Sequence, residues 1–109
     1  MRFQAVQDII RAAKAPPPQH ALRRAFTLCL RNLRRAGGMS QETLALAAAL
    51  DRGYMSGLER GKHSPTLETI YRLITALDIT LAEFSEEYER CLRRALMQGG
   101  PEDENNFAE

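Results

Sequence analysis

The side chains most able to do chemistry in this 109-residue chain gather between Gln41 and Thr66, and they are hydrogen-bond donors. Within that stretch, a guanidinium such as that of Arg52 can bond guanine O6 and N7 together, an arrangement that discriminates against a wrong base by about 1–3 kcal/mol. Amide, ammonium, imidazole and hydroxyl groups can bond phosphate oxygens, which position a protein on DNA without specifying sequence. The candidates for such phosphate contacts are Gln41, Tyr54, Lys62, His63, Ser64 and Thr66.

The same residue types offer no catalytic or metal-binding arrangement. The sequence pairs no nucleophile with a base, has no carboxylate pair at a useful spacing and has no glycine loop that would cradle a phosphate. His63 could be a metal ligand or a base, but no Cys, Asp or His stands at a useful spacing from it. Cys29 and Cys91 lie far apart without zinc-ligand spacing, and we interpret both as reduced packing residues. We therefore expect no enzyme, no metal and no cofactor.

Charge is distributed unevenly along the chain, although the formal net charge is only +1. Residues 20–62 contain eight Lys or Arg and three acids, a local charge of +5, whereas residues 78–109 have a local charge of −6. A basic region is what contact with phosphates requires. Without a DNA-binding motif, ordinary solvated helix faces would be the preferred explanation of these charges.

Such a motif is indicated by the stretch from Ser40 to Gly61. Ser40 can cap a short, alanine-rich helix whose small side chains allow very close packing. After a break of about three residues, Asp51 can cap a second short helix, which Gly61 ends. Two such helices joined by so tight a turn have the geometry of a helix-turn-helix, in which the second helix lies in the major groove of DNA.

Hydrophobic periodicity predicts helices on both sides of this motif. The first covers residues 21–35, with most of its arginines, including Arg24 and Arg31, facing largely away from the core. Thr66 caps a helix over residues 67–77, and a last helix starts near Leu81 and ends at Gly99. The sequence therefore predicts an all-α fold with a five-helix DNA-binding domain.

The N-terminal segment is an addition to this domain. Its apolar residues fall at helical spacing, so we expect an amphipathic helix of about three turns before the stiff connector Pro16-Pro17-Pro18. The expected organisation is an amphipathic helix and connector over residues 1–19, the DNA-binding domain over 20–84, and a helix extension with a disordered acidic tail over 85–109. No apolar run is long enough to span a membrane and the N-terminus is not a secretion signal, so a cytoplasmic location is expected.

Three runs of residues resemble the Xre family of phage-repressor-like helix-turn-helix proteins. They read SQETLA, LDRGYMSGLERGKHSPTLETI and LITALDITLAEF, and they fall in the order and spacing of that family over about residues 22–84. Within the family, LDRGYMSGLERG looks most like the controller proteins of restriction-modification systems. Ala49 departs from the pattern, because the family usually has Gly at this turn position, where the chain tends toward a left-handed conformation.

The resemblance implies a set of base-contacting positions on the second motif helix. Arg52 stands where the family makes its first base contact, and Ser56 is a second candidate. Gly53 and Gly57 occupy two positions that often carry reading side chains in the family, so direct readout should be sparse and supported by close backbone approach and DNA shape. Tyr54 is set by the family pattern, and either a structural role or a phosphate contact is compatible with it. The resemblance also implies an ion pair between Arg34 and Glu59.

The apolar stripe of the last helix is wider than the domain core should need, which favours a homodimer. The residues expected at the dimer interface are Leu81, Phe84, Tyr88, Cys91, Leu92 and Ala95. The alternative is that the N-terminal helix covers this stripe within one chain. That helix could equally close a dimer or dock on another protein.

These expectations converge on a transcriptional regulator that binds a palindromic operator in double-stranded DNA as a homodimer. The alternative from another class is an antitoxin, which would bind DNA with the same domain and neutralise a protein toxin through the N-terminal arm or the acidic tail.

Overall fold

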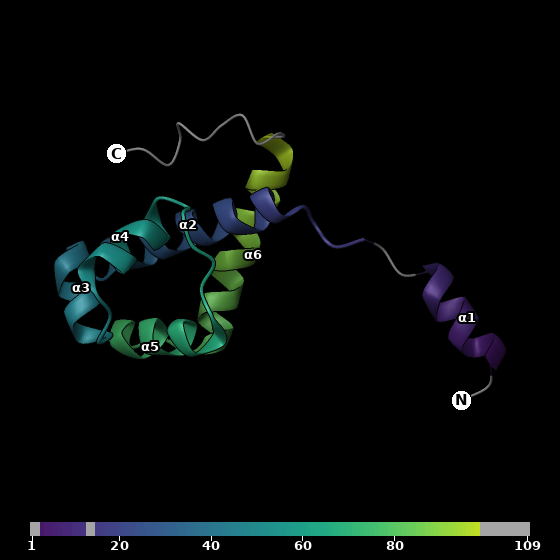
Figure 1. Cartoon of the computed structure of the whole chain (residues 1–109), viewed down its shortest axis with the longest axis horizontal. Coiled ribbons are helices and arrows are strands. Elements are labelled where there is room, and N and C mark those ends of the chain that lie inside the picture. Colours follow the sequence, from purple (N-terminus) through teal and green to yellow (C-terminus); the bar gives the residue numbers. More distant parts are fainter. Residues whose placement is uncertain (1–2, 13–14, 99–109) are drawn as a thin grey trace.

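A computed structural model of the chain describes residues 3–12 and 15–98, and within these residues it contains six helices and no strand. The helices are, in order, α1 (Phe3–Ala12), α2 (Gln19–Ala36), α3 (Gln41–Ala47), α4 (Arg52–Glu59), α5 (Leu67–Leu77) and α6 (Leu81–Gln98) (Figure 1). The all-α fold expected from the sequence is confirmed. The acidic tail and the expected helix end at Gly99 lie outside the described residues.

Side-chain caps set the starts of the helices in the motif region. The Oγ of Ser40 accepts a hydrogen bond from the backbone N–H of Thr43 at 3.0 Å, and Thr66 does the same for α5 with the N–H of Thr69 at 3.1 Å. The last helix, α6, begins with a reciprocal pair, because the N–H of Thr80 donates to Glu83 Oε1 while the N–H of Glu83 donates to Thr80 Oγ1. These local bonds explain why the helix starts follow closely from the sequence.

The core lies where α2 crosses the motif helices and α6. Its largest fully buried apolar side chains come from α2, α3, α4 and α5, namely Leu30, Leu44, Met55, Leu58 and Leu73. Each deeply buried leucine or methionine contributes about 1.5–3 kcal/mol through removal of apolar surface from water. The core therefore fixes α3 and α4 against α2, and this fixes the direction in which the exposed face of α4 points.

The apolar stripe of α6 packs inside the chain, which changes the interpretation of the expected dimer interface. Phe84, Cys91 and Ala95 are buried as part of the core, and the Tyr88 hydroxyl donates to the backbone carbonyl of Leu22 on α2 at 3.1 Å. The reason is the length of α2, which at 18 residues matches α6 and covers the stripe along its length. Of the six expected interface residues, Leu81 remains exposed, and Tyr88 and Leu92 are half-buried.

The N-terminal helix does not cover that stripe either. α1 stands apart from the other five helices at the end of an extended connector (Figure 1). The connector enters α2 at Pro18, whose φ of −64° and ψ of 152° are those of a polyproline II chain. Among the described residues, no helix combines the length and apolar character that crossing a bilayer requires.

Candidate nucleic-acid interface

The turn between α3 and α4 aims the second motif helix. Ala49 has a φ of +57°, a left-handed conformation that an alanine rarely adopts, and the N–H of Leu50 reaches back to the carbonyl of Ala45 at 2.8 Å. Asp51 then caps α4, because its Oδ2 accepts a hydrogen bond from the N–H of Tyr54 at 3.1 Å. The sequence thus forms the tight turn even without the glycine that this position favours.

The first turn of α4 presents a polar face to solvent. Arg52 and Gly53 are exposed and Ser56 is half-buried, and these three positions share one side of the helix. Met55 and Leu58 point the other way and are fully buried. The exposed end of α4 therefore offers one long donor side chain, Arg52, one hydroxyl and a stretch of bare backbone.

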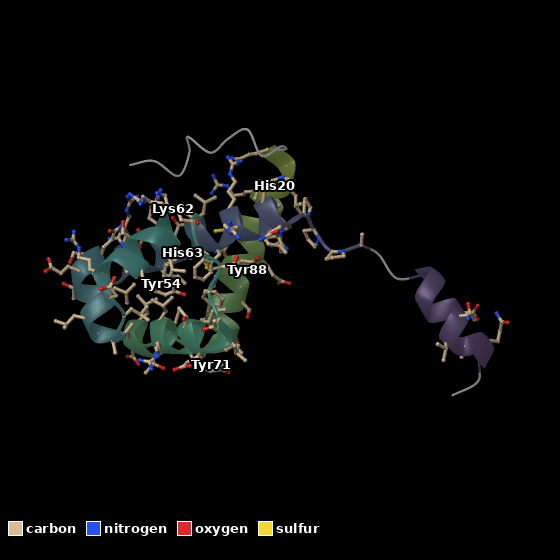
Figure 2. The ribbon with its side chains drawn as sticks, in the orientation of Figure 1. His20, Tyr54, Lys62, His63, Tyr71 and Tyr88 are labelled. Atoms are coloured by element: carbon tan, nitrogen blue, oxygen red, sulfur yellow. The ribbon has the colours of Figure 1, made fainter. Side chains whose placement is uncertain are left out.

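Gly57 lies beneath another side chain instead of facing outward. It is buried, and a Cβ added to it would come within 2.7 Å of Nε2 of His63. The imidazole ring of His63 also stacks on the ring of Tyr54, with centroids 5.4 Å apart, as the side-chain view shows (Figure 2). The absence of a side chain at Gly57 thus makes room for this stack, and a base contact at Gly57 would require His63 to move.

The loop after α4 carries three of the residues expected to contact phosphate, namely Lys62, His63 and Ser64. Lys62 and His63 are exposed, and the N–H of Lys62 is bonded to the carbonyl of Gly57 at 2.8 Å, which ties the loop to the end of α4. Ser64 is exposed and accepts from Arg23 of α2, with Nη2 at 3.0 Å and Nε at 3.2 Å. These bonds hold the loop that carries Lys62, His63 and Ser64 against the C-terminal half of α4 and against α2.

The side chains of Gln41 and Thr66, two further residues expected to contact phosphate, are also engaged within the chain. The Gln41 amide donates to Glu59 Oε1 at 3.0 Å. The Thr66 hydroxyl donates to Thr69 Oγ1 at 3.0 Å while it caps α5. In the structure both side chains support the scaffold, so a phosphate contact from either would compete with an existing bond.

A buried carboxylate anchors the end of α4 to α2. Arg34 Nε donates to Glu59 Oε2 at 2.6 Å and Nη2 donates to Oε1 at 2.9 Å, and the Glu59 side chain is only 1% exposed. Arg31 adds a hydrogen bond from Nη2 to the Glu59 carbonyl at 2.9 Å. This two-pronged geometry is the strong form of an arginine–carboxylate contact, and it fixes the C-terminal end of α4.

Sequence reasoning missed Arg31 and Arg23. Arg24 and Arg31 were expected to face away from the core, yet both are buried. Arg31 precedes Arg34 by one helical turn, so the two share a face, and this spacing was a signal that both would turn toward Glu59. The bond between Arg23 and Ser64 joins residues 41 positions apart, and no local pattern indicates it.

Comparison with known proteins places residues 30–84 in a family profile described as Helix-turn-helix. Over 51 residues the chain is 39% identical to an uncharacterized HTH-type transcriptional regulator, y4dJ, of Sinorhizobium fredii; the match covers 47% of this chain and 66% of that protein, just under two thirds of its length. The structure of the restriction-modification controller protein C.AhdI from Aeromonas hydrophila is similar, with 48% identity, a TM-score of 0.55, and coverage of 57% of this chain and 94% of that one.

A second controller protein is similar in a DNA-bound form. The C.Esp1396I tetramer in complex with its natural 35 base-pair operator shares 28% identity with this chain at a TM-score of 0.63. The similarity covers 65% of this chain and 93% of that one. The similarity therefore covers nearly all of that controller protein, while about a third of this chain lies beyond it.

Proposed function

Since this chain belongs to the helix-turn-helix family, we propose that it is a sequence-specific transcriptional regulator that binds a palindromic operator in double-stranded DNA as a homodimer. No catalytic step belongs to this proposal. Operator binding requires access to the chromosome, so the proposal includes a cytoplasmic location.

The observation that carries the proposal is the exposed N-terminal end of α4 together with the loop that follows this helix. Arg52 stands at the start of α4, where residues of a recognition helix reach base edges. Lys62 and Ser64 lie on the loop that follows α4, and this loop is bonded to Gly57 in the C-terminal half of α4 and to Arg23 of α2. A single base-reading arginine flanked by phosphate donors is the arrangement that sequence-specific DNA binding needs.

The relatives and the charge distribution support the same function. C.Esp1396I, whose fold this chain shares, is a controller protein solved on its own operator as a tetramer. The basic region over residues 20–62 includes the motif, and the acidic residues are concentrated elsewhere. A homodimer remains part of the proposal because one sparse reading helix covers too few base pairs to select a site in a genome.

The experiment is selection of bound oligonucleotides from a random pool at a stated salt concentration, run in parallel with wild type and with Arg52→Ala. We expect wild type to enrich an inverted repeat, and the variant to lose preference at a base in each half-site. Enrichment of no sequence by the wild-type chain would show that it is not a sequence-specific regulator. Enrichment of a single unrepeated site would agree with a sequence-specific regulator but would reject binding as a homodimer.

A further inference from the structure

The N-terminal helix has an apolar face by its sequence and stands apart from the rest of its chain. Phe3, Val6, Ile9 and Ile10 fall at helical spacing in α1, and Val6 is 36% exposed. Figure 1 shows α1 well separated from the helical domain. An isolated helix of 10 residues is marginal in water, because most helical stability comes from packing of an apolar face. This helix therefore needs a surface to pack on.

The domain has an apolar groove on the side where the connector joins it. The groove has a volume of about 260 Å³. It is lined by apolar side chains from α2, the loop before α5, α5 itself and α6, chiefly Leu22, Phe26, Pro65, Ile70, Phe84 and Tyr88. An apolar cavity of about 150 Å³ holds a benzene ring, so this groove has room for one or more side chains of the size found on α1.

The connector keeps α1 away from the groove of its own chain. Gln19, the first residue of α2, lines the groove, so the connector leaves from the groove's edge. The three prolines before it favour an extended chain of about 3.1 Å per residue, and Pro18 has that conformation. They direct the chain outward for about 9 Å before it can turn. A helix held in this way is directed toward a neighbouring molecule.

We propose that two copies of the chain exchange their N-terminal helices, so that α1 of each copy docks in the groove formed by α2, α5 and α6 of the other. Each chain carries one amphipathic helix that stands apart and one apolar groove, and reciprocal exchange fills both grooves and closes a two-fold dimer. Docking of an amphipathic helix in an apolar groove is a common mode of recognition.

The exchange also connects the dimer to the DNA-facing loop. Ser64 and Pro65 line the groove, and Ser64 holds the loop through its bonds to Arg23. Lys62 and His63 precede them directly on the same loop. A helix in the groove would therefore brace the loop that carries the proposed phosphate contacts. The exchange itself does not rest on the DNA-binding proposal, because it is measured without DNA.

The experiment places one cysteine in each of two separately purified chains. Val6→Cys marks α1, and Leu22→Cys or Ile70→Cys marks the groove, at half-buried positions on two different helices. The native thiols should not compete, since Cys29 and Cys91 are buried and burial raises the pKa of Cys91 to about 11. The matched control is Gln4→Cys, on the opposite face of α1.

After mixing and mild oxidation, we expect a disulfide between a Val6→Cys chain and a groove-cysteine chain, formed several-fold more than with Gln4→Cys. Absence of a mixed disulfide with both groove positions would overturn the exchange, as would equal yields from Val6→Cys and Gln4→Cys. In a chain that carries Val6→Cys and Leu22→Cys together, a disulfide closed within one monomer at high dilution would show that α1 docks on its own domain, which also rejects the exchange. Failure of any of these tests leaves operator selection by the wild-type chain unaffected.

Discussion

At the scale of single residues, Arg52 and Lys62 should act on DNA in different ways. Arg52 lies at the exposed start of α4, and Lys62 lies on the following loop. We expect Arg52→Ala to weaken binding to the selected operator by about 1–3 kcal/mol while non-specific binding stays nearly intact, because a base contact is lost. Titration of operator and of unrelated DNA at matched salt would measure both quantities.

The contrast with Lys62→Ala is the control. Loss of a phosphate contact should weaken binding to every sequence and reduce the slope of log affinity against log salt by about one. If Arg52→Ala lowered affinity for operator and unrelated DNA alike, its assignment to base reading would be wrong.

We expect the ion pair between Arg34 and Glu59 to act mainly on the stability of the fold. Both side chains are buried, with exposed fractions of 11% and 1%, so removal of either takes from a buried charge its nearest opposite charge. We expect Arg34→Ala and Glu59→Ala each to reduce the free energy of unfolding by about 3–5 kcal/mol. Denaturation of both single variants and of the double variant would give the coupling between them.

The exposed pair of Arg72 and Glu68 is the matched comparison. Its side chains are 44% and 74% exposed, and Arg72→Ala should cost only about 0.3–0.5 kcal/mol. If the losses in free energy of unfolding from Arg34→Ala and Glu59→Ala were additive in the double variant, the two residues would not stabilise the fold as a pair. A loss no larger than that of Arg72→Ala would also contradict a stabilising role for the buried pair.

At the scale of the elements, the turn between α3 and α4 is strained at one residue. Ala49 has a φ of +57°, which glycine adopts without steric cost. Ala49→Gly should therefore raise the free energy of unfolding by about 1 kcal/mol. Ala47→Gly, in the last turn of α3, should lower it by about 0.5–1 kcal/mol, since that residue is helical. Thermal denaturation of both variants measures these changes in the free energy of unfolding. If both variants were destabilised, strain at Ala49 would not be significant.

The helix α4 and the loop after it are coupled through Gly57 and His63. Alanine in a helix interior is normally more stable than glycine by about 0.5–1 kcal/mol. Here the added methyl group would displace the His63 ring from its stack on Tyr54. We therefore expect Gly57→Ala to raise the free energy of unfolding by the full amount only when His63→Ala is also present. With His63 intact, the increase should be smaller or absent. Urea denaturation of the four proteins measures the difference.

Gly53→Ala serves as the reference for that cycle. A Cβ at Gly53 would meet the Asp51 carboxylate and not His63, so its effect should be the same in both backgrounds. If Gly57→Ala also changed stability by the same amount with and without His63, the His63 ring would move aside without an energetic cost.

The sequence could predict a structural feature when the residues that determine it are near neighbours in the chain. The starts of α3, α4 and α5 depend on Ser40, Asp51 and Thr66, each of which caps within three residues, and these boundaries were predicted correctly. The stripe on α6 was also identified, but its partner was not, because contact between Phe84 or Cys91 and α2 is a long-range property of packing. A periodic apolar face indicates burial without indicating which surface covers it.

The same limit applies to the candidate interface. The exposed position of Arg52 follows from the cap at Asp51 and the helical period, both of which are local. The burial of Gly57 under His63 and the inward turn of Gln41 depend on side chains that meet only after the chain folds. Sequence patterns therefore located the elements of the candidate interface better than they predicted the surroundings of its individual side chains.

At the scale of the whole molecule, a two-fold dimer imposes a spacing on its operator. Two copies of α4 related by a two-fold axis read half-sites about one helical turn apart, ~34 Å, on one face of the duplex. Insertion of about five base pairs between the half-sites moves the second half-site to the opposite face. We therefore expect such an insertion to abolish cooperative binding to the selected operator, while binding to each half-site alone stays unchanged.

Titration of the wild-type chain against the operator, the lengthened operator and a single half-site would measure this, with sedimentation at tens of micromolar to give the mass of the free protein. The chain should sediment as a dimer, and two chains should bind one palindrome. The half-site is the internal control, because a dimer that spans one palindrome gains affinity only when both helices engage DNA at once. A monomer in solution, bound one to one on each half-site regardless of spacing, would contradict the homodimer and leave recognition to a single α4 helix.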